Sequence, residues 1–390
     1  MCLSDGGLAH RFGVGPHLKH LSEVQVSSKA LLHNFLALKS LCSPNVETVV
    51  VVKGNAYGHG MKEVIAVLGN EPDAYQVDDL DELEELRQIS SKRALVLGYV
   101  PLNAVATALE LGAELAVYDL ERLPIIDQCA RSLGKRANVH IKVDALLGRQ
   151  GVLPSDLPEF LAQLEKCEWI EPITAYSHFA NIEDTTDMSH ARAQSDTFNK
   201  AFDGIQRRFP GIGRHESATS GLLAYEGDSP KNHLVRLGIG IYGLYPSQEL
   251  ARSHANLELR PVMRWMTHLA QVKDLPAGHP VGYGLTFVTD KPTRIGIVPQ
   301  GYSDGFDRGY SNNGFALVCG QKCRVLGRVA MNMFAVDVSD VEGVSAEDEV
   351  VLIGAQGEES ISAEEMAERI GTINYEVTTR ISPLLPRMVV

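Results

Sequence analysis

The chain has 390 residues, of which 44% are hydrophobic and 22% charged, and its formal net charge is −13 at pH 7. This length predicts about two domains, and the composition is that of a folded globular protein rather than a disordered one. The acidic balance disfavours nucleic acid or an anionic membrane as the main partner. No run of 18 apolar residues predicts a transmembrane helix, so we expect no membrane association.

The six cysteines are dispersed along the chain, which suits a reducing compartment. Cys319 and Cys323 are four residues apart, but no second Cys/His pair lies near them. We therefore expect no metal site and a cytoplasmic location.

The N-terminal part of the chain changes character at about residue 22. Residues 1–22 are aperiodic and lack the apolar core of a signal peptide, so we treat them as a leader of unknown role. A short alternating strand is predicted from Ser22 to Ser28, and a helix with apolar spacing follows through Leu31, Phe35 and Leu38.

Eight short apolar segments follow, most of them separated by stretches with helical periodicity. They are Val46–Lys53, Ala74–Val77, Ala94–Tyr99, Leu115–Asp119, Ala137–Asp144, Ile173–Phe179, Gly213–Ser220 and Leu234–Ile239. Eight β-then-α units over roughly 200 residues are typical of a (β/α)₈ barrel. We therefore predict an α/β fold with an N-terminal TIM-type barrel over residues 23–256.

Beyond residue 256 the pattern changes to β-rich segments joined by Gly, Pro and Asp turns. A final helix over 362–370 and a short strand end the chain. Residues 257–390 are therefore predicted to form a mostly-β C-terminal domain.

The most informative stretch is Val49–Val52 followed by Lys53. Four consecutive valines are typical of a strand buried on both faces, as in a parallel sheet. A lysine at the end of such a strand is partly desolvated, which favours the free amine that attacks carbonyl groups. The alternative is a surface lysine that buries only its aliphatic stem, and this stretch alone does not decide between them.

Other chemically capable residues also follow predicted barrel strands, where the active sites of such barrels lie. They are Arg149, His178, Ser217 and Arg236. Each alone is more often structural, but with Lys53 they make five polar groups at one end of the barrel. Packing alone does not explain that convergence.

Gly238 and Ile239 follow the last strand, where barrels commonly bind phosphate through backbone N–H groups. Ser217 and Tyr57 could add hydroxyl donors. No nucleotide-binding glycine fingerprint opens a helix after a strand, which disfavours an NTP or a dinucleotide. A cofactor with a phosphate and an aldehyde would use both this site and Lys53, and pyridoxal 5′-phosphate fits that description.

The ordered set of motifs resembles the alanine racemase family, which consists of fold type III pyridoxal-phosphate enzymes, over nearly the whole chain from about residue 23. Val51-Val52-Lys53-Gly54-Asn55-Ala56-Tyr57-Gly58-His59-Gly60 resembles the cofactor-lysine motif. The further matching blocks are His140–Asp144 with Gly148-Arg149, Ser177–Ala180, Val235–Ile239 with Tyr242-Gly243, Val281–Gly284, Gly301–Gly305, Gly327–Met331 and Asn374–Glu376.

In the barrel, the resemblance implies a role for each matching residue. Lys53 would form the Schiff base with the cofactor and act as a base on one face of the substrate. Arg236 would hydrogen-bond the pyridine nitrogen, and His178 would lie against the ring and orient Arg236. Arg149 would contact the cofactor's phenolic oxygen and the substrate carboxylate. The phosphate would be held by Tyr57, Ser217, Gly238, Ile239 and, from the C-terminal domain, Tyr375.

In the C-terminal domain, the resemblance implies that Tyr283 of the partner subunit is the acid/base on the opposite face. Met331 would bind substrate from the second chain, and Tyr302 would line the entrance. Lys142 lies where family members often carry a carboxylated lysine.

The activity so implied is a two-base interconversion of L- and D-alanine by a homodimer with shared active sites, supplying D-alanine for peptidoglycan. A proton removed from one face of the α-carbon and returned on the other requires two groups. A guanidinium on the pyridine nitrogen keeps that nitrogen unprotonated, because arginine does not give up its proton in practice.

Three departures from the family pattern bear on the substrate. Asp144–Arg149 reads Asp-Ala-Leu-Leu-Gly-Arg where Asp-Thr-Gly-Met usually precedes the arginine motif. Asn332 follows Met331 where aspartate is usual, and Glu216 precedes Ser217 where asparagine is usual. A serine-preferring or broader racemase on the same scaffold is therefore an alternative.

Three further alternatives belong to other classes. A fold type III decarboxylase would carry a Gly-x-x-Cys-Glu motif, which is absent. A non-catalytic pyridoxal-phosphate-binding protein needs neither Tyr283 nor a β-domain. A phosphate-sugar barrel enzyme without cofactor leaves the Lys53 motif unexplained.

Overall fold

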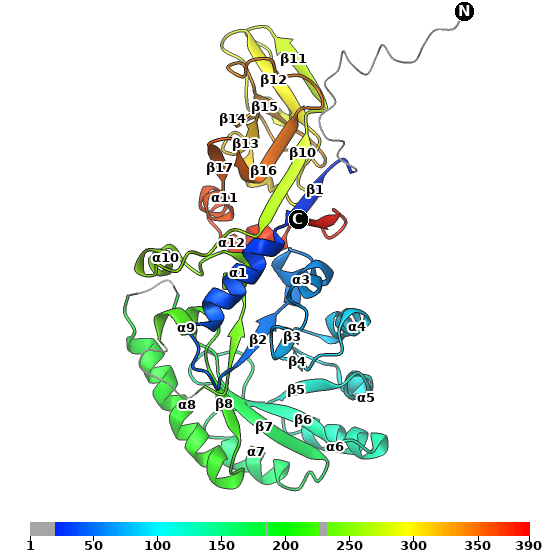
Figure 1. The fold of residues 1–390 in the computed structure, drawn as a ribbon, viewed down its shortest axis with the longest axis vertical. Helices are drawn as coiled ribbons and strands as arrows, with labels where there is room; N and C mark the ends of the chain where they lie inside the picture. The colour runs from blue at the N-terminus through cyan, green and yellow to red at the C-terminus, as the bar shows by residue number, and fades with distance from the viewer. Residues whose placement is uncertain (1–19, 184–185, 226–231) are drawn as a thin grey trace, which may run out of the picture. The chain divides into compact units, whose positions relative to one another are not determined.

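The computed structural model describes residues 20–183, 186–225 and 232–390. The chain forms two compact units (Figure 1). The barrel unit comprises Ser28–Tyr57 and Met61–Pro261, and the β unit comprises the described residues up to Ser27, Gly58–Gly60 and Val262–Val390. The predicted leader at residues 1–22 lies outside the described residues except for 20–22. Within the described part, no helix is long and apolar enough to cross a membrane.

In the described residues of the barrel unit, eight parallel strands pair in the order β8-β7-β6-β5-β4-β3-β2-β9. The ends of this sheet meet only through an isolated bridge between Ala218, after β8, and Arg236 on β9, so the barrel is nearly closed. This confirms the predicted (β/α)₈ architecture. The strands are β2 (Glu47–Val51), β3 (Ala74–Val77), β4 (Ala94–Val96), β5 (Ala113–Val117), β6 (Ala137–Lys142), β7 (Ile170–Tyr176), β8 (Gly213–His215) and β9 (Leu234–Leu237).

Helices cover the outside of this sheet (Figure 1). The helical segments described in the barrel unit are α1 (Ser28–Lys39), α2 (Lys53–Tyr57), α3 (Met61–Leu68), α4 (Leu80–Ile89), α5 (Val105–Glu110) after the 3₁₀ turn η1 (Leu102–Ala104), α6 (Arg122–Leu133), α7 (Leu157–Leu164), α8 (Ser189–Arg208), α9 (Thr219–Ala224), the 3₁₀ turn η2 (Ile239–Tyr242) and α10 (Gln248–Ser253). The apolar spacing predicted for the first helix corresponds to α1, which buries Leu31, Phe35 and Leu38.

Hydrophobic burial explains why these strands lie at the centre of the unit. Val49, Val50 and Val52 are fully buried and Val51 is 4% exposed, and each such side chain contributes about 1.5–3 kcal/mol on burial. Because β2 is buried on both faces, its sequence is a continuous apolar run rather than an alternating one.

The β unit is built around a ten-stranded sheet with the order β11-β12-β15-β14-β13-β16-β10-β1-β18, in which β17 also pairs with β16. This confirms the predicted mostly-β C-terminal domain. Its strands are β1 (Glu23–Val26), β10 (Met263–His268), β11 (Gln271–Leu275), β12 (Thr293–Val298), β13 (Phe315–Val318), β14 (Gln321–Leu326), β15 (Phe334–Asp337), β16 (Glu349–Gln356), β17 (Glu359–Ile361) and β18 (Arg387–Val389). Its helical segments are η3 (Tyr283–Leu285), η4 (Arg308–Tyr310), α11 (Ala363–Ile370) and α12 (Asn374–Thr379).

The structure differs from the predicted domain boundary at the N-terminal side. β1 was expected at the start of the barrel domain, but it pairs antiparallel with β10 and parallel with β18. Residues 23–27 therefore belong to the β unit, because their backbone hydrogen bonds are made in its sheet. At the other boundary, the division at Pro261 lies five residues beyond the predicted residue 256.

An aromatic cluster supports the loops at one end of the β unit. Phe306 stacks on Phe334 with ring centroids 4.3 Å apart and also packs against Tyr310 at 4.8 Å. Both Phe306 and Tyr310 are buried. This packing fixes the segment that follows Gly301, which carries Tyr302.

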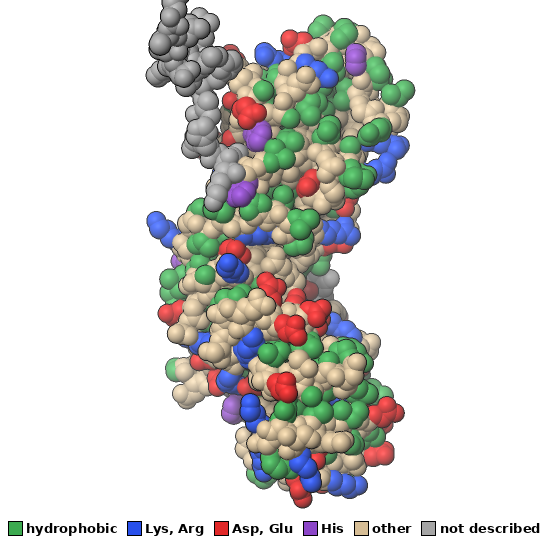
Figure 2. All heavy atoms as spheres, turned by 90° about the vertical axis from the view of Figure 1, so that its right-hand side faces the viewer, with side chains coloured by type: hydrophobic (Ala, Val, Ile, Leu, Met, Phe, Trp, Pro, Cys, Tyr) green, Lys and Arg blue, Asp and Glu red, His purple; other side chains and the backbone are tan. Residues whose placement is uncertain are grey.

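On the face shown in Figure 2, Lys and Arg side chains are dispersed among acidic ones. α4 carries three exposed acidic residues, Asp81, Glu84 and Glu85. The net charge is −13, and the described residues on this face show no cluster of basic side chains of the kind that binds nucleic acid.

Candidate active site

Lys53 lies at the C-terminal end of β2, at the mouth of the barrel. Its Nζ donates a hydrogen bond to Asp78 Oδ1 at 3.1 Å, and the side chains of Lys53 and Asp78 are 43% and 49% exposed. The Lys53 side chain is thus neither fully buried nor fully exposed. An exposed pair of this kind is weak, so the amine can leave Asp78 for a ligand.

The residues after Lys53 form a left-handed turn. Gly54, Asn55, Ala56 and Tyr57 have φ angles of 61°, 52°, 53° and 53°, and each non-glycine residue in this region costs roughly 1–2 kcal/mol. Asn55 Oδ1 accepts from the backbone N–H of Met61 at 2.9 Å, and Gly54 N–H donates to Glu82 Oε1 at 2.6 Å. Such strain is retained where surrounding contacts hold it, and it is common at functional sites.

The left-handed turn brings Tyr57 against the end of β9. A Cβ built on Gly238 would lie 3.0 Å from the Tyr57 hydroxyl oxygen, so only glycine leaves ordinary space there. Burial raises the pKa of Tyr57, which keeps its hydroxyl protonated. Tyr57 and Gly238, two predicted phosphate ligands, are therefore neighbours.

Ser217 and Ile239 are buried at the ends of β8 and β9. The Ser217 Oγ accepts from Asn232 Nδ2 at 3.1 Å, and the Gly238 N–H donates to Thr219 Oγ1 at 3.0 Å. These hydroxyl and amide groups can hydrogen-bond an anionic ligand. The carboxylates of Glu183, Asp78 and Glu82 also lie close enough to raise the pKa of Tyr57.

Arg236 is the buried cation of the site. Its side chain donates to His215 Nδ1, to the Glu216 carbonyl oxygen at 2.9 Å and to the Ser177 carbonyl oxygen at 3.3 Å. Burial, more than any other cause, lowers the pKa of Arg236 to about 10, so it remains charged near neutrality. None of these partners is a carboxylate, and a buried charge with neutral partners favours an anionic or electron-rich ligand.

His178 Nδ1 accepts a hydrogen bond from Arg236 at 3.3 Å. Burial and then the charge of Arg236 lower the pKa of His178 to about 3. The ring is therefore neutral across the physiological range.

Lys142 and Arg149 add positive charge at the end of β6. Lys142 Nζ donates to Gln150 Oε1 at 3.2 Å and lies 5.7 Å from the centre of the Tyr176 ring, while Arg149 is exposed. Burial and then the charges of Arg149, Arg236 and Lys53 lower the pKa of Lys142 to about 8. All four cations thus influence one region, and part of the Lys142 population is an uncharged, nucleophilic amine near neutrality.

The remaining predicted site residues lie on the β unit. Gly301 packs against the chain at Ala330 and Met331, since an added Cβ would lie 2.3 Å from both carbonyl oxygens. The Tyr302 N–H donates to the Ala330 carbonyl at 3.1 Å, which places Tyr302 beside the Met331 loop. Tyr302 is 45% exposed and Met331 is 55% exposed.

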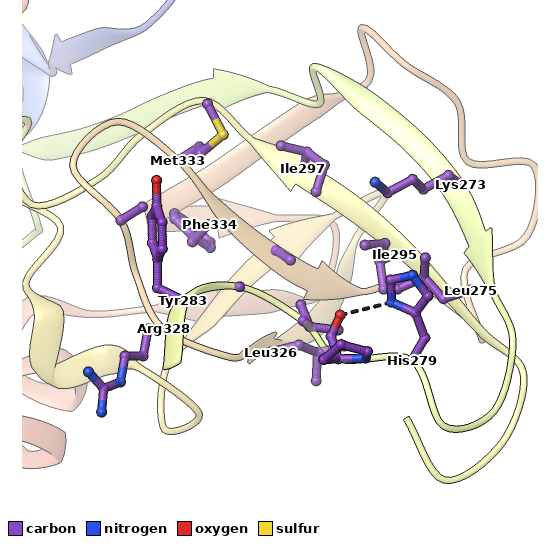
Figure 3. Close-up of a pocket in the computed structure, with 15 residues that line it drawn as sticks. Lys273, Leu275, His279, Tyr283, Ile295, Ile297, Leu326, Arg328, Met333 and Phe334 are labelled. Atoms are coloured by element: carbon purple, nitrogen blue, oxygen red, sulfur yellow. Dashed lines mark hydrogen bonds between the residues drawn. The ribbon is translucent and has the colours of Figure 1, made fainter. Parts of the chain in front are cut away.

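Tyr283 is 73% exposed and stands on η3 between Gly282 and Gly284, whose φ angles are 73° and 72°. It lines a pocket on the β unit in which Met333 and Phe334 lie beside it, while Arg328 points away (Figure 3). Tyr375 lies half-buried on α12.

The structure also identifies polar residues that sequence reasoning did not assign to the site. Asp78 pairs with Lys53, and His215, Thr174, His140 and Glu114 form buried hydrogen bonds beneath Arg236. The sequence offered one signal for them, because each of four barrel strands carries a polar residue within an otherwise apolar segment.

Two family models match almost all of the chain. The alanine racemase N-terminal domain model matches residues 26–246, and the alanine racemase C-terminal domain model matches residues 262–389. The chain is 35% identical to alanine racemase 2 of Caldanaerobacter subterraneus subsp. tengcongensis over 370 residues, which are 94% of each protein.

Solved structures agree with this. The alanine racemase from D-cycloserine-producing Streptomyces lavendulae superposes with a TM-score of 0.89 at 31% identity, covering 96% of this chain and 98% of that one. The alanine racemase from Bacillus anthracis with bound L-Ala-P gives a TM-score of 0.89 at 30% identity, covering 96% of each chain. With matches of this extent over both units, the chain belongs to the alanine racemase family of isomerases.

Proposed function

We propose that this protein is an amino-acid racemase that interconverts L- and D-alanine with pyridoxal 5′-phosphate as cofactor. The observation that carries the proposal is the convergence of Lys53, Arg236, His178 and the Tyr57–Gly238 contact at one end of the barrel. The names of the relatives support alanine as the substrate. The D-alanine would supply peptidoglycan precursors in the cytoplasm.

The donor set at the barrel mouth fits the cofactor. Lys53 would offer an amine for the aldehyde. Tyr57 and Ser217 would offer hydroxyl groups and Ile239 an N–H group for the phosphate, as Tyr375 would from α12. The Gly238 N–H would exchange Thr219 Oγ1 for the phosphate. When bound, pyridoxal phosphate supplies an aldehyde that condenses with amines and a ring that withdraws electrons from the substrate α-carbon.

Arg236 would hydrogen-bond the pyridine nitrogen and keep it unprotonated, because a guanidinium donates but does not accept. The hydrogen bond from Arg236 to His178 Nδ1 at 3.3 Å supports an orienting role for His178. With its nitrogen unprotonated, the ring withdraws electrons less strongly, which would suppress transamination.

Two groups would move the proton. Lys53 Nζ would act on one face of the α-carbon and Tyr283 of the partner subunit on the other. The high exposure of Tyr283 on its own β unit supports a role completed by a second chain. Leu285, Val288, Met331 and Met333 of the β unit are exposed as well, and exposed hydrophobic surfaces commonly mark protein interfaces. The active unit would be a homodimer with shared sites.

Arg149 would bind the substrate carboxylate, while Met331 and Tyr302 of the partner subunit would limit the space for its side chain. Lys142 would be carboxylated: its lowered pKa supplies the free amine that reacts with carbon dioxide, and the carbamate would pair with Arg149. Leu146 and Asn332 differ from the usual family residues near these positions. Serine is therefore the alternative substrate.

The test is α-proton exchange in D₂O, followed by NMR with purified holoenzyme and single L-amino acids. We expect exchange largely confined to alanine, with D-alanine appearing alongside. If serine exchanged faster than alanine, serine would be the preferred substrate and the proposed mechanism would stand. If no amino acid exchanged, the racemase proposal would be wrong and the protein would be a cofactor-binding protein.

A further inference from the structure

A chain of buried polar side chains runs from Arg236 through the barrel interior to the opposite side of the sheet. We call it the barrel relay, and it consists of Arg236 on β9, His215 on β8, Thr174 on β7, His140 on β6 and Glu114 on β5. Each of these residues is at most 5% exposed, and the two histidines are fully buried. Five adjacent strands thus contribute one polar residue each to an otherwise apolar barrel.

The contacts are continuous. Arg236 contacts His215 Nδ1, and His215 Nε2 lies 3.1 Å from Thr174 Oγ1. The Thr174 Oγ1 lies 2.5 Å from His140 Nδ1, and His140 Nε2 lies 3.3 Å from Glu114 Oε2. Beyond Glu114, Arg93 Nε donates to Glu114 Oε1 at 2.8 Å.

The chemistry of the two ends fixes the direction of every hydrogen bond. A guanidinium only donates, so His215 Nδ1 accepts and its single proton lies on Nε2. That proton is donated to Thr174 Oγ1, whose own proton goes to His140 Nδ1. His140 then carries its proton on Nε2 and donates it to Glu114, which as a carboxylate only accepts.

This arrangement requires both histidines to be neutral. Burial is the main cause that lowers the pKa of His215 and of His140. Burial would raise the pKa of Glu114, but hydrogen bonds from His140 and Arg93 lower it to about 2. The negative charge of the relay therefore resides at Glu114, four hydrogen bonds from the guanidinium.

We propose that Thr174, His140 and Glu114 are positioning residues for the cofactor, acting through His215 on Arg236. The relay gives the buried guanidinium a neutral, aligned acceptor, and consecutive hydrogen bonds polarise one another. Arg236 thus gains an acceptor that carries no charge, while the nearby Glu216 carboxylate is paired with Arg214. Its remaining N–H groups stay available for the pyridine nitrogen. This inference rests on the proposed function, which assigns Arg236 to the cofactor.

The first test is ¹⁵N NMR of histidine-labelled holoenzyme between pH 5.5 and 9, with signals assigned by comparison with His140→Gln and His215→Asn. We expect both rings to remain neutral with the proton on Nε2. A ring that carries its proton on Nδ1, or that becomes protonated in this range, would overturn the relay. This result does not depend on racemase activity, so it separates failure of the relay from failure of the proposed function.

The second test compares Thr174→Val with Thr174→Ser. Valine keeps the shape but removes the hydroxyl, which leaves two buried ring nitrogens without a partner, whereas serine keeps the hydroxyl. We expect the valine variant to lose its cofactor about tenfold faster during dialysis, followed by cofactor absorption, and kcat to fall about tenfold with little change in KM. We expect the serine variant to remain within about twofold of wild type.

If Thr174→Val only lowered the melting temperature, with cofactor release and kcat unchanged, the hydroxyl would be structural and the positioning role would be wrong. If Thr174→Val fails to fold, the tautomers of His140 and His215 in the wild-type holoenzyme and in the serine variant still test the relay.

Discussion

The two halves of the proposed chemistry lie at the barrel mouth and on exposed loops of the β unit, and they differ in burial and in hydrogen bonding. Arg236 is 4% exposed and is held by hydrogen bonds from several directions, whereas Tyr283 is 73% exposed. The barrel half is therefore preorganised within one chain, while Tyr283 has no such support from its own loops. In the proposed mechanism, the buried barrel site would hold the cofactor, and the exposed Tyr283 would act in the site of a partner subunit.

The largest effect is expected at the barrel mouth. Lys53→Ala removes the amine that would bind the cofactor covalently and act as a base, so racemisation should fall by at least about 10³-fold. The characteristic cofactor absorption of the holoenzyme should also disappear. Lys62→Ala, at an exposed position on α3, is the matched control and should behave as wild type. Retention of the cofactor absorption in the Lys53 variant would contradict its assignment.

On the β unit, Tyr283→Phe should lower racemisation by roughly 10²–10⁴-fold, because one of the two acid/base groups is lost. Cofactor absorption should be unchanged, since the barrel half is intact. Full activity in both directions would rule out the two-base assignment. Tyr245→Phe on the barrel unit is the control for loss of a tyrosine hydroxyl.

Mixing the two inactive variants tests whether the halves come from different chains. A heterodimer of Lys53→Ala and Tyr283→Phe subunits would contain one site with both groups intact. After subunit exchange, about a quarter of wild-type activity should return. If each chain supplied both groups to its own site, activity would stay at the level of the separate variants.

The sequence predicted the barrel half well because its signals are local. Each buried strand is a short apolar run, and the residue that follows it lies at the mouth by the geometry of the fold. Lys53, Ser217 and Gly238 could therefore be placed from their positions alone. The resemblance to a family added their roles, which spacing did not show.

Three features could not be predicted because they depend on distant contacts. β1 pairs with β10, more than 200 residues later, so its sheet could not be assigned from its own alternation. The left-handed turn after Lys53 contains Asn55 and Ala56, whose backbone preference is right-handed, and tertiary contacts hold it. Thr174 and His140 were not assigned to the site because single polar residues in strands are usually structural.

A moderate effect is expected on acid stability through Glu114. Its folded-state pKa of about 2 lies below the ordinary value of 4.5, so its contribution is complete above pH 4.5 and is lost as the pH falls toward 2. A shift of this size corresponds to about 3 kcal/mol. Glu114→Gln should therefore lower the free energy of unfolding by about this amount at pH 7, and the deficit should shrink as the pH falls below 4.5.

Urea unfolding at pH 7, 5 and 3.5 measures this deficit. Glu165→Gln is the control, because Glu165 pairs with Arg208 at 2.9 Å on the surface, where such pairs contribute little. A deficit that stays constant with pH would mean that the charge of Glu114 is not the stabilising feature.

The smallest effect is expected at Leu146, which has a φ of 63° where the family usually has glycine. Its carbonyl accepts from His190 Nε2 at 3.1 Å, and Asp144 Oδ1 accepts from the N–H of Leu147 at 2.9 Å and of Gly148 at 3.0 Å. These hydrogen bonds hold the loop in a conformation that leucine disfavours. Leu146→Gly should relieve that strain, and the added freedom of glycine in the unfolded chain should leave a net change within about 1 kcal/mol.

The same substitution removes a half-exposed side chain from the loop that carries Arg149. The ratio of kcat/KM for alanine to that for serine should change by less than about tenfold, because a wall of a pocket discriminates a hydroxyl only modestly. Leu147→Gly, at a residue without a positive φ, is the control and should destabilise the protein with no strain to relieve. If both glycine variants lost the same stability, the Leu146 backbone would not be strained, and the departure from the family would act on the substrate alone.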